Sequence, residues 1–236
     1  MIRGLHASTT RFIAKVPGSP RLWLMLVAAC LLAYGFFEIV DDVFSDPLEG
    51  DLESDEFDAA VREFFMQFRS ERLTQVAVDL TALGSVSVLT VFAILAYAVI
   101  VGKRDYLGFA HMTVALAGAL LWPVLLKNYF GRDRPDLIER LVTVSDLSFP
   151  SGHAFGAAAA YATFAFFCAR FIRAHSGEVF CYLFALLLVG VIGLTRIYLG
   201  VHYPTDVLAG FTAGGAWAFF VAAAFSPFYA EAPLRA

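Results

Sequence analysis

The chain has 236 residues, of which 59% are hydrophobic and only 16% are charged, and its mean hydropathy is +0.70. This apolar share exceeds that of ordinary soluble domains, and the apolar residues gather into long uncharged runs, which predicts a helical membrane domain. A formal net charge of -4, without any run of five basic residues, argues against nucleic acid as a partner.

The first predicted element is an apolar run from Leu22 to Val40, which follows a leader formed by residues 1–21. Its length is close to the roughly 20 residues that a helix needs to cross a bilayer. A cleaved signal peptide is the alternative, but the leader is long and the run ends in Glu38-Ile-Val-Asp41, without a small-residue cleavage site. We therefore expect an uncleaved anchor preceded by a cytoplasmic leader.

An acidic segment follows, with nine Asp or Glu residues between positions 41 and 58. A metal site is conceivable there, but the order of the acids does not match a calcium-binding loop, so we interpret the segment as solvated surface. Apolar side chains then recur at helical spacing, which predicts a short helix lying in the membrane interface. They are Phe57, Val61, Phe64, Phe65 and Phe68. Residues 41–72 are thus expected to form an outer loop and an interfacial helix.

Five further apolar runs complete six predicted spans, so residues 22–225 are expected to form one all-α, six-helix membrane domain. The runs are Leu80–Gly102, Tyr106–Leu126, Ala154–Ala169, Val179–Leu194 and Val207–Phe225. Within them, His111 is expected to hydrogen-bond a neighbouring helix, and Gly210–Gly214 to form a helix-packing face. Residues 226–236 are expected to be a frayed tail.

The short loops carry their Lys and Arg residues on one side of the predicted bundle. These residues are Arg3, Arg11, Lys15, Arg21, Lys103, Arg104, Arg170 and Arg173. Because cytoplasmic loops are enriched in Lys and Arg, both termini are expected in the cytoplasm of a cell whose plasma (inner) membrane holds the protein. Segments 41–72, 127–150 and 195–206 then face the periplasm or the exterior.

Three polar segments lie on that outer side, where they can form one site. They are Lys127-Asn-Tyr-Phe-Gly-Arg-Asp-Arg134-Pro135, Pro150-Ser151-Gly152-His153 and Thr195-Arg196-Ile-Tyr-Leu-Gly-Val-His202-Tyr-Pro-Thr-Asp206. Charged side chains are costly at membrane depth, so their joint presence indicates a function. Lys127, Arg134 and Arg196 supply three positive charges, and guanidinium groups suit the paired oxygens of a phosphate.

The two histidines of these segments have different settings. Ser151 and Gly152 open an apolar helix, so their backbone N–H groups and the helix dipole can face the same anion. His153 then stands where it can protonate a leaving oxygen. His202 and Asp206 are four residues apart, so the carboxylate can hold one ring nitrogen and leave the other free to attack phosphorus.

Together the three segments resemble the signature of the type 2 phosphatidic acid phosphatase superfamily, Lys-x6-Arg-Pro, Pro-Ser-Gly-His and Ser-Arg-x5-His-x3-Asp. Thr195 stands where the family usually has Ser, which keeps the hydroxyl but weakens the prediction that this side chain contacts phosphate. The resemblance implies that His202 is the nucleophile, oriented by Asp206, and that His153 protonates the leaving group. The residues that it implies for phosphate binding are Lys127, Arg134, Ser151, Gly152, Arg196 and Thr195. We interpret Arg132 and Asp133, within the first motif, as structural.

The resemblance further implies catalysis without a metal or other cofactor, on a lipid phosphate that enters from the outer leaflet. Bacterial members of this size act on undecaprenyl diphosphate, phosphatidylglycerol phosphate, phosphatidate or lipid A phosphates, and the motifs do not choose among them. Transfer of phosphate to an acceptor lipid is an alternative that uses the same site. A non-catalytic phospholipid transporter is another, although it would not need an oriented nucleophile. No protein partner is predicted.

Overall fold

The computed structural model describes residues 19–44, 53–135, 140–172 and 174–231, and all regular structure within them is helical. The predicted cytoplasmic leader, except for its last residues, and the middle of the acidic outer loop lie outside the described residues. The elements are α2 (Pro20–Phe44), α3 (Glu53–Met66), α4 (Glu71–Thr81), the 3-10 turn η2 (Ala82–Gly84), α5 (Val86–Gly102), α6 (Tyr106–Phe130), α7 (Gly152–Phe171), α8 (His175–Tyr198) and α9 (Pro204–Glu231).

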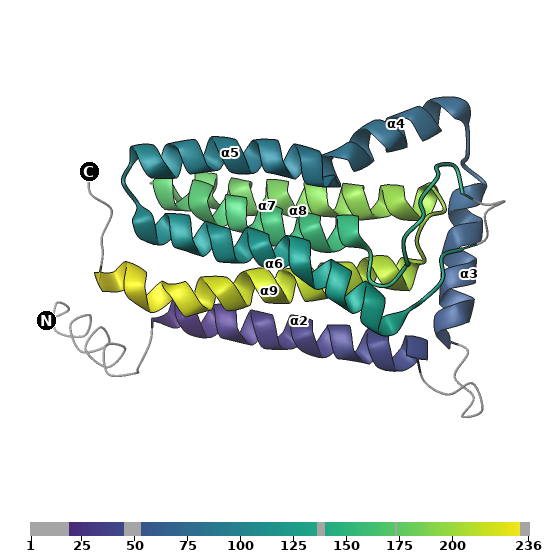
Figure 1. Ribbon diagram of the computed structural model, residues 1–236, viewed down its shortest axis with the longest axis horizontal. Coiled ribbons are helices and arrows are strands. Elements are labelled where there is room, and N and C mark those ends of the chain that lie inside the picture. Colours follow the sequence, from purple (N-terminus) through teal and green to yellow (C-terminus); the bar gives the residue numbers. More distant parts are fainter. Residues whose placement is uncertain (1–18, 45–52, 136–139, 173, 232–236) are drawn as a thin grey trace, which may run out of the picture.

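Five of these helices are long and apolar enough to cross a membrane, and the bent pair formed by α4 and α5 makes a sixth candidate. The second span was predicted as a single run from Leu80 to Gly102, but the chain bends by 45° there (Figure 1). The reason is local: the Ser85 hydroxyl accepts the Val88 N–H at 3.3 Å and begins α5 as a new helix after η2. This segment is therefore a bent pair of helices and not the single straight run that was predicted.

The long helices run side by side, and α7 lies at the centre of the bundle with α8 and α9 packed on it (Figure 1). Of the most apolar stretch of α7, 67% is buried, against 11% for α2. Small side chains allow this close packing, since α7 buries a run of alanines from Ala157 to Ala160. By contrast, α2, α5 and α8 direct large apolar side chains outward, as lipid-facing helices do.

Helices α7 and α9 approach closely at two glycines of the predicted packing face. A Cβ built on Gly210 would lie 2.8 Å from the Ser151 carbonyl oxygen, and one on Gly214 would lie 2.4 Å from the Phe155 carbonyl oxygen. The expectation that Gly210–Gly214 packs helices together is confirmed. This contact joins the beginning of α9 to the beginning of α7, which are the two helices that carry the predicted histidine motifs.

Helix α9 continues to Glu231, past the residue 225 at which the sequence predicted the last span to end. The prediction of a frayed tail is thus wrong for residues 226–231, where Tyr229 anchors the helix, while residues 232–236 lie outside the described residues. The Tyr229 hydroxyl lies 3.0 Å from His111 Nδ1, and the Arg170 guanidinium stacks 3.8 Å from the tyrosine ring centroid. The hydrogen bond also confirms that His111 pairs with a neighbouring helix.

Helix α3 crosses one end of the bundle instead of running along it (Figure 1). Its predicted apolar face is divided: Val61 and Phe65 pack against buried residues of α4, α8 and α9, whereas Phe57 and Phe64 are 43% and 54% exposed. Phe68 lies beyond the end of α3 and is 53% exposed. The arrangement suits a helix that covers the end of the bundle and presents aromatic rings outward.

Candidate active site

The three polar segments meet at the end of the bundle that α3 crosses. The end of α6, the beginning of α7, the end of α8 and the beginning of α9 all lie there (Figure 1). Most of the predicted site residues are buried despite their polarity: Lys127, Arg134, Ser151, Thr195, Arg196, His202 and Asp206 are each at most 9% exposed. Buried charges must be paired or hydrogen-bonded, so their partners define what the site can do.

His202 lies in the short turn between α8 and α9, and Asp206 lies in the first turn of α9. The Nδ1 atom of His202 is 3.4 Å from Asp206 Oδ2, and its Nε2 atom is 3.1 Å from Arg134 Nη1. A guanidinium has only donors, so Nε2 must be the acceptor and the ring proton must sit on Nδ1, facing the carboxylate. The lone pair of Nε2 therefore points toward the cation expected to bind phosphate.

His202 is also held in its neutral form. Burial lowers its pKa to about 3; Asp206 opposes this shift, while the positive charges of Arg134 and Arg196 add to it. A neutral imidazole with Nδ1–H bound to a carboxylate is the arrangement of an oriented nucleophile.

Asp206 is fixed by three further donors. Its Oδ2 accepts the Ser148 hydroxyl at 2.5 Å and the Tyr203 N–H at 2.9 Å, and its Oδ1 accepts Arg132 Nη1 at 2.7 Å. Sequence reasoning missed Ser148 and assigned Arg132 only a structural role. The only signal for Ser148 was its position two residues before Pro150, and for Arg132 its position two residues before Arg134.

Arg132 connects Asp206 to helix α3. Its Nη2 lies 3.0 Å from Asp58 Oδ2, while Asp58 also accepts the Thr205 N–H at 2.9 Å and the Thr205 hydroxyl at 2.7 Å. Asp58 therefore satisfies a free N–H at the beginning of α9. Burial lowers the pKa of Arg132, but Asp206 and Asp58 outweigh it and the net shift is upward. Sequence reasoning placed Asp58 in the solvated acidic segment, yet it is 2% exposed.

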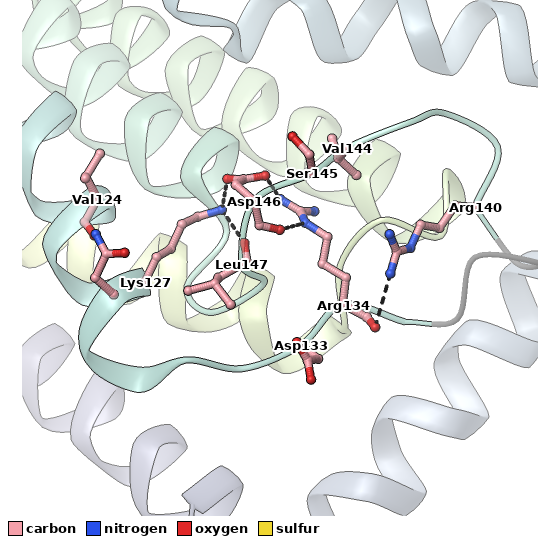
Figure 2. A pocket seen from close by; sticks show the side chains of 10 residues that line it. Val124, Lys127, Asp133, Arg134, Arg140, Val144, Ser145, Asp146 and Leu147 are labelled. Atoms are coloured by element: carbon pink, nitrogen blue, oxygen red, sulfur yellow. Dashed lines mark hydrogen bonds and ion pairs between the residues drawn. The ribbon is translucent and has the colours of Figure 1, made fainter.

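Lys127 and Arg134 converge on the loop that precedes α7. The carboxylate of Asp146 lies between them: it forms an ion pair with Lys127 and accepts Arg134 Nη2 at 2.6 Å (Figure 2). These residues line a cavity of about 420 Å³, together with Val124, Asn128, Asp133, Arg140, Val144, Ser145 and Leu147. Asp146 was not singled out from the sequence, because a lone acid in a polar loop has no distinguishing pattern.

Arg196 approaches the site from α8 and donates from Nη1 to the Thr81 hydroxyl at 3.1 Å. It is 4% exposed, and among the described residues its Nε has no hydrogen-bond partner. A buried guanidinium with a spare donor suits an anion. Thr195 differs from the prediction: its hydroxyl donates to the Ile192 carbonyl of its own helix at 2.6 Å, so it does not point a donor at the site.

The segment Ser151-Gly152-His153 begins α7, as predicted. Ser151 is the N-cap residue, and its N–H donates to the Asp206 carbonyl at 2.9 Å, which joins the second and third motifs. A Cβ built on Gly152 would lie 3.9 Å from Lys127 Cε, so this glycine stands beside the first motif. His153 lies against η2, where a Cβ built on Gly84 would be 3.4 Å from its Cδ2.

This constellation of cations around an oriented histidine agrees with the comparisons with known proteins. The model of the PAP2 superfamily matches residues 106–229, which include every motif described above. The chain belongs to the PAP2 superfamily. Like other members, it is an all-helical membrane protein and a phosphatase.

Individual relatives of this PAP2 protein support the assignment. A Bacillus subtilis protein named phosphatidylglycerophosphatase B is 34% identical over 161 residues, which cover 66% of this chain and 77% of the relative. A Rhizobium etli lipid A 1-phosphatase is 34% identical over 116 residues, covering 45% of each chain. The crystal structure of a transmembrane PAP2-type phosphatidylglycerolphosphate phosphatase from Bacillus subtilis superimposes with a TM-score of 0.75 at 27% identity, covering 88% of this chain and 98% of that one.

Proposed function

We propose that this PAP2 protein hydrolyses the terminal phosphate of a lipid at the outer face of the membrane, through a covalent phosphohistidine on His202. The observation that carries the proposal is the orientation of His202, whose Nδ1 faces Asp206 and whose Nε2 faces Arg134. A binding protein or transporter would need the cations but not this nucleophile.

In the first half of the reaction, His202 Nε2 attacks phosphorus and the bond between phosphorus and the lipid oxygen breaks. Asp206 stabilises the positive charge that develops on the imidazole, and His153 gives its proton to the departing oxygen. Lys127, Arg134 and Arg196 neutralise the phosphate oxygens, helped by the N–H groups at the beginning of α7.

In the second half, water attacks the phosphohistidine and the phosphorus–nitrogen bond breaks. His153, now neutral, takes the proton of the attacking water, by microscopic reversibility. Inorganic phosphate leaves, and His202 returns to its neutral form with the proton on Nδ1. None of these steps requires a metal ion.

The substrate is a lipid phosphomonoester or diphosphate, because Lys127, Arg134 and Arg196 together can neutralise one terminal phosphate. The relatives are named for phosphatidylglycerophosphate and lipid A phosphate, and both are amphiphiles that present such a group at a membrane surface. We include phosphatidate and undecaprenyl diphosphate in the same class. The Lys127–Arg134 cavity opens beside the end of α6, where a lipid head group can reach it.

The test is phosphate release from a panel of these lipids in detergent with EDTA present, comparing the wild type with His202→Ala. We expect release that persists in EDTA and falls at least about a thousandfold in the variant, because the residue forms the covalent bond. His175→Ala is the matched control, since His175 lies on the exposed surface, with a side chain 88% exposed. Full activity in His202→Ala would overturn the nucleophile assignment, and release only with an added acceptor lipid would favour phosphate transfer.

A further inference from the structure

Asp146 places a negative charge where the proposed function needs a phosphate. Its Oδ1 accepts Arg134 Nη2 at 2.6 Å, and its Oδ2 pairs with Lys127 Nζ. The two cations are deeply buried, with side chains 10% and 4% exposed, whereas the Asp146 side chain is 59% exposed. The carboxylate is therefore the most exposed of the three groups, and it lies between the two cations (Figure 2). It is held firmly ionised: burial raises its pKa, but the hydrogen bond and charge of Lys127 and the charge of Arg134 lower it to about 2.

The two cations do not depend on this carboxylate for their positions. Arg134 donates from Nε to the Asp146 backbone carbonyl at 2.7 Å and from Nη1 to the Val201 carbonyl at 2.5 Å. Lys127 donates to the Leu147 carbonyl at 2.5 Å. Each cation thus has a backbone anchor that remains when the Asp146 side chain moves away.

The carboxylate is carried by a segment without regular structure. Asp146 lies in the stretch between residues 140 and 151, which has no helix, and its side chain faces the 420 Å³ cavity. A rotation of the side chain into the cavity would vacate both cations without disturbing a packed helix. A phosphate arriving from the cavity would then contact Lys127 and Arg134 in its place.

We propose that Asp146 is a specificity-determining residue that competes with the incoming head group for Lys127 and Arg134. Its single charge yields to a terminal phosphate, which carries about two negative charges and three acceptor oxygens at neutral pH. It does not yield to a phosphodiester head group, which carries one charge and would gain nothing over the carboxylate. Bulk diester lipids would otherwise occupy an open cationic site beside the membrane surface, so Asp146 keeps the site available. This inference rests on the proposed function.

The test is inhibition by a diester lipid, using detergent micelles that contain a fixed amount of the best substrate and increasing phosphatidylglycerol. In Asp146→Asn, which keeps the shape of the side chain but removes its charge, we expect the inhibition constant for phosphatidylglycerol to fall about 3- to 10-fold. The inhibition constant for inorganic phosphate should fall as well, because both anions compete with the same carboxylate for Lys127 and Arg134. Asp146→Ala should show the same changes.

Asp133→Asn is the matched control, because Asp133 is an exposed carboxylate that lines the same cavity and is drawn apart from the two cations in Figure 2. We expect its inhibition constants to stay within about twofold of the wild type. If Asp146→Asn instead raised KM and weakened inhibition, Asp146 would be a residue that orients the cations, and the inference would be wrong. If Asp133→Asn lowered the inhibition constants as much as Asp146→Asn, the effect would come from the loss of any nearby negative charge, and the inference about Asp146 would be wrong. Absence of phosphate release by the wild type would overturn the proposed function itself.

Discussion

At the scale of single residues, the site is organised around one aspartate that has a donor for each oxygen. Asp206 faces His202 Nδ1, while Ser148 and Arg132 hold its two oxygens. The proposed nucleophile and its aspartate are thus kept in place by Ser148 and Arg132, which are not among the proposed phosphate-binding residues. Such positioning residues matter because a small displacement of a nucleophile lowers the rate steeply.

Asp58→Asn tests this positioning at a distance from the reaction. The change removes the charge that holds Arg132 from the side of α3, so Arg132 loses part of its support for Asp206. We expect a loss of about 1–3 kcal/mol in the free energy of unfolding, as for a buried hydrogen bond to a charged group. We also expect kcat to fall at least about fivefold with little change in KM, since the cations proposed to bind phosphate are not touched. Thermal unfolding and steady-state kinetics in detergent measure the two effects.

Asp55→Asn is the control on the same helix, because Asp55 is exposed. It should change neither stability nor kcat appreciably. If Asp58→Asn lowered stability but left kcat unaltered, Asp58 would be structural only, and the connection from α3 to His202 would carry no function.

Much of the site could be predicted from the spacing of residues within each motif, but contacts between segments far apart in the sequence could not. The four-residue separation of His202 and Asp206 and the helix beginning at Gly152 are local features, and the structure has both. Asp58 is different, because its partner Thr205 is 147 positions away and only the crossing of α3 brings them together. Asp146 likewise acquires its role from two cations that converge on a loop.

At the scale of elements, the geometry of the site depends on how closely α7 and α9 approach. Both helices begin at the site, and glycines let their backbones come together there. The lengths of the helices were less predictable than their existence. Apolar runs identify the spans but not their ends. The bend in the second predicted span depends on a single capping hydroxyl, that of Ser85. The extension of the last span depends on the contact between Tyr229 and His111, which lie on different helices.

Gly214→Ala tests the α7–α9 contact. The added methyl group would lie 2.4 Å from the Phe155 carbonyl oxygen, which is backbone and cannot rotate away. We expect a loss of about 1–3 kcal/mol in the free energy of unfolding, as for other overpacked sites, with a decrease in kcat because the beginnings of both helices shift. Thermal unfolding in detergent provides the measurement.

Gly190→Ala is the matched control in α8, where a Cβ meets nothing within 4 Å. It should leave activity unchanged and alter stability by no more than the difference in helix propensity, about 1 kcal/mol in favour of Ala. Equal behaviour of the two variants would show that the α7–α9 approach is not a constraint.

At the scale of the whole molecule, the six-span, all-helical membrane fold could be predicted from hydropathy, because a bilayer admits few alternatives. The match to the PAP2 superfamily and to a transmembrane PAP2 structure confirms the fold class. Orientation stays a prediction from the Lys and Arg residues of the short loops. The two sides are well separated, since the turn at Lys103 and the loop at Asp133 lie at opposite ends of α6 (Figure 1).

Cysteine labelling on intact cells tests this orientation. In a background with the native cysteines replaced by alanine, Asp133→Cys should react with a membrane-impermeant maleimide, because the site is expected to face outward. Lys103→Cys should react only after the membrane is permeabilised. Both positions are exposed, so a difference in labelling would reflect the side of the membrane on which each residue lies and not its burial in the protein. The reverse pattern would place the site in the cytoplasm.

The central claim is that His202 carries the phosphate during the reaction, and the most direct measurement is capture of that bond. The wild type and His202→Ala would be mixed with a lipid labelled in its terminal phosphate, quenched in alkali within the first turnover, and denatured. A phosphorus–nitrogen bond survives alkali and breaks in acid, so we predict label on the wild-type protein that is stable in alkali and lost in acid, and none on the variant. Equal labelling of both proteins, or label on the wild type that survives acid, would contradict the account.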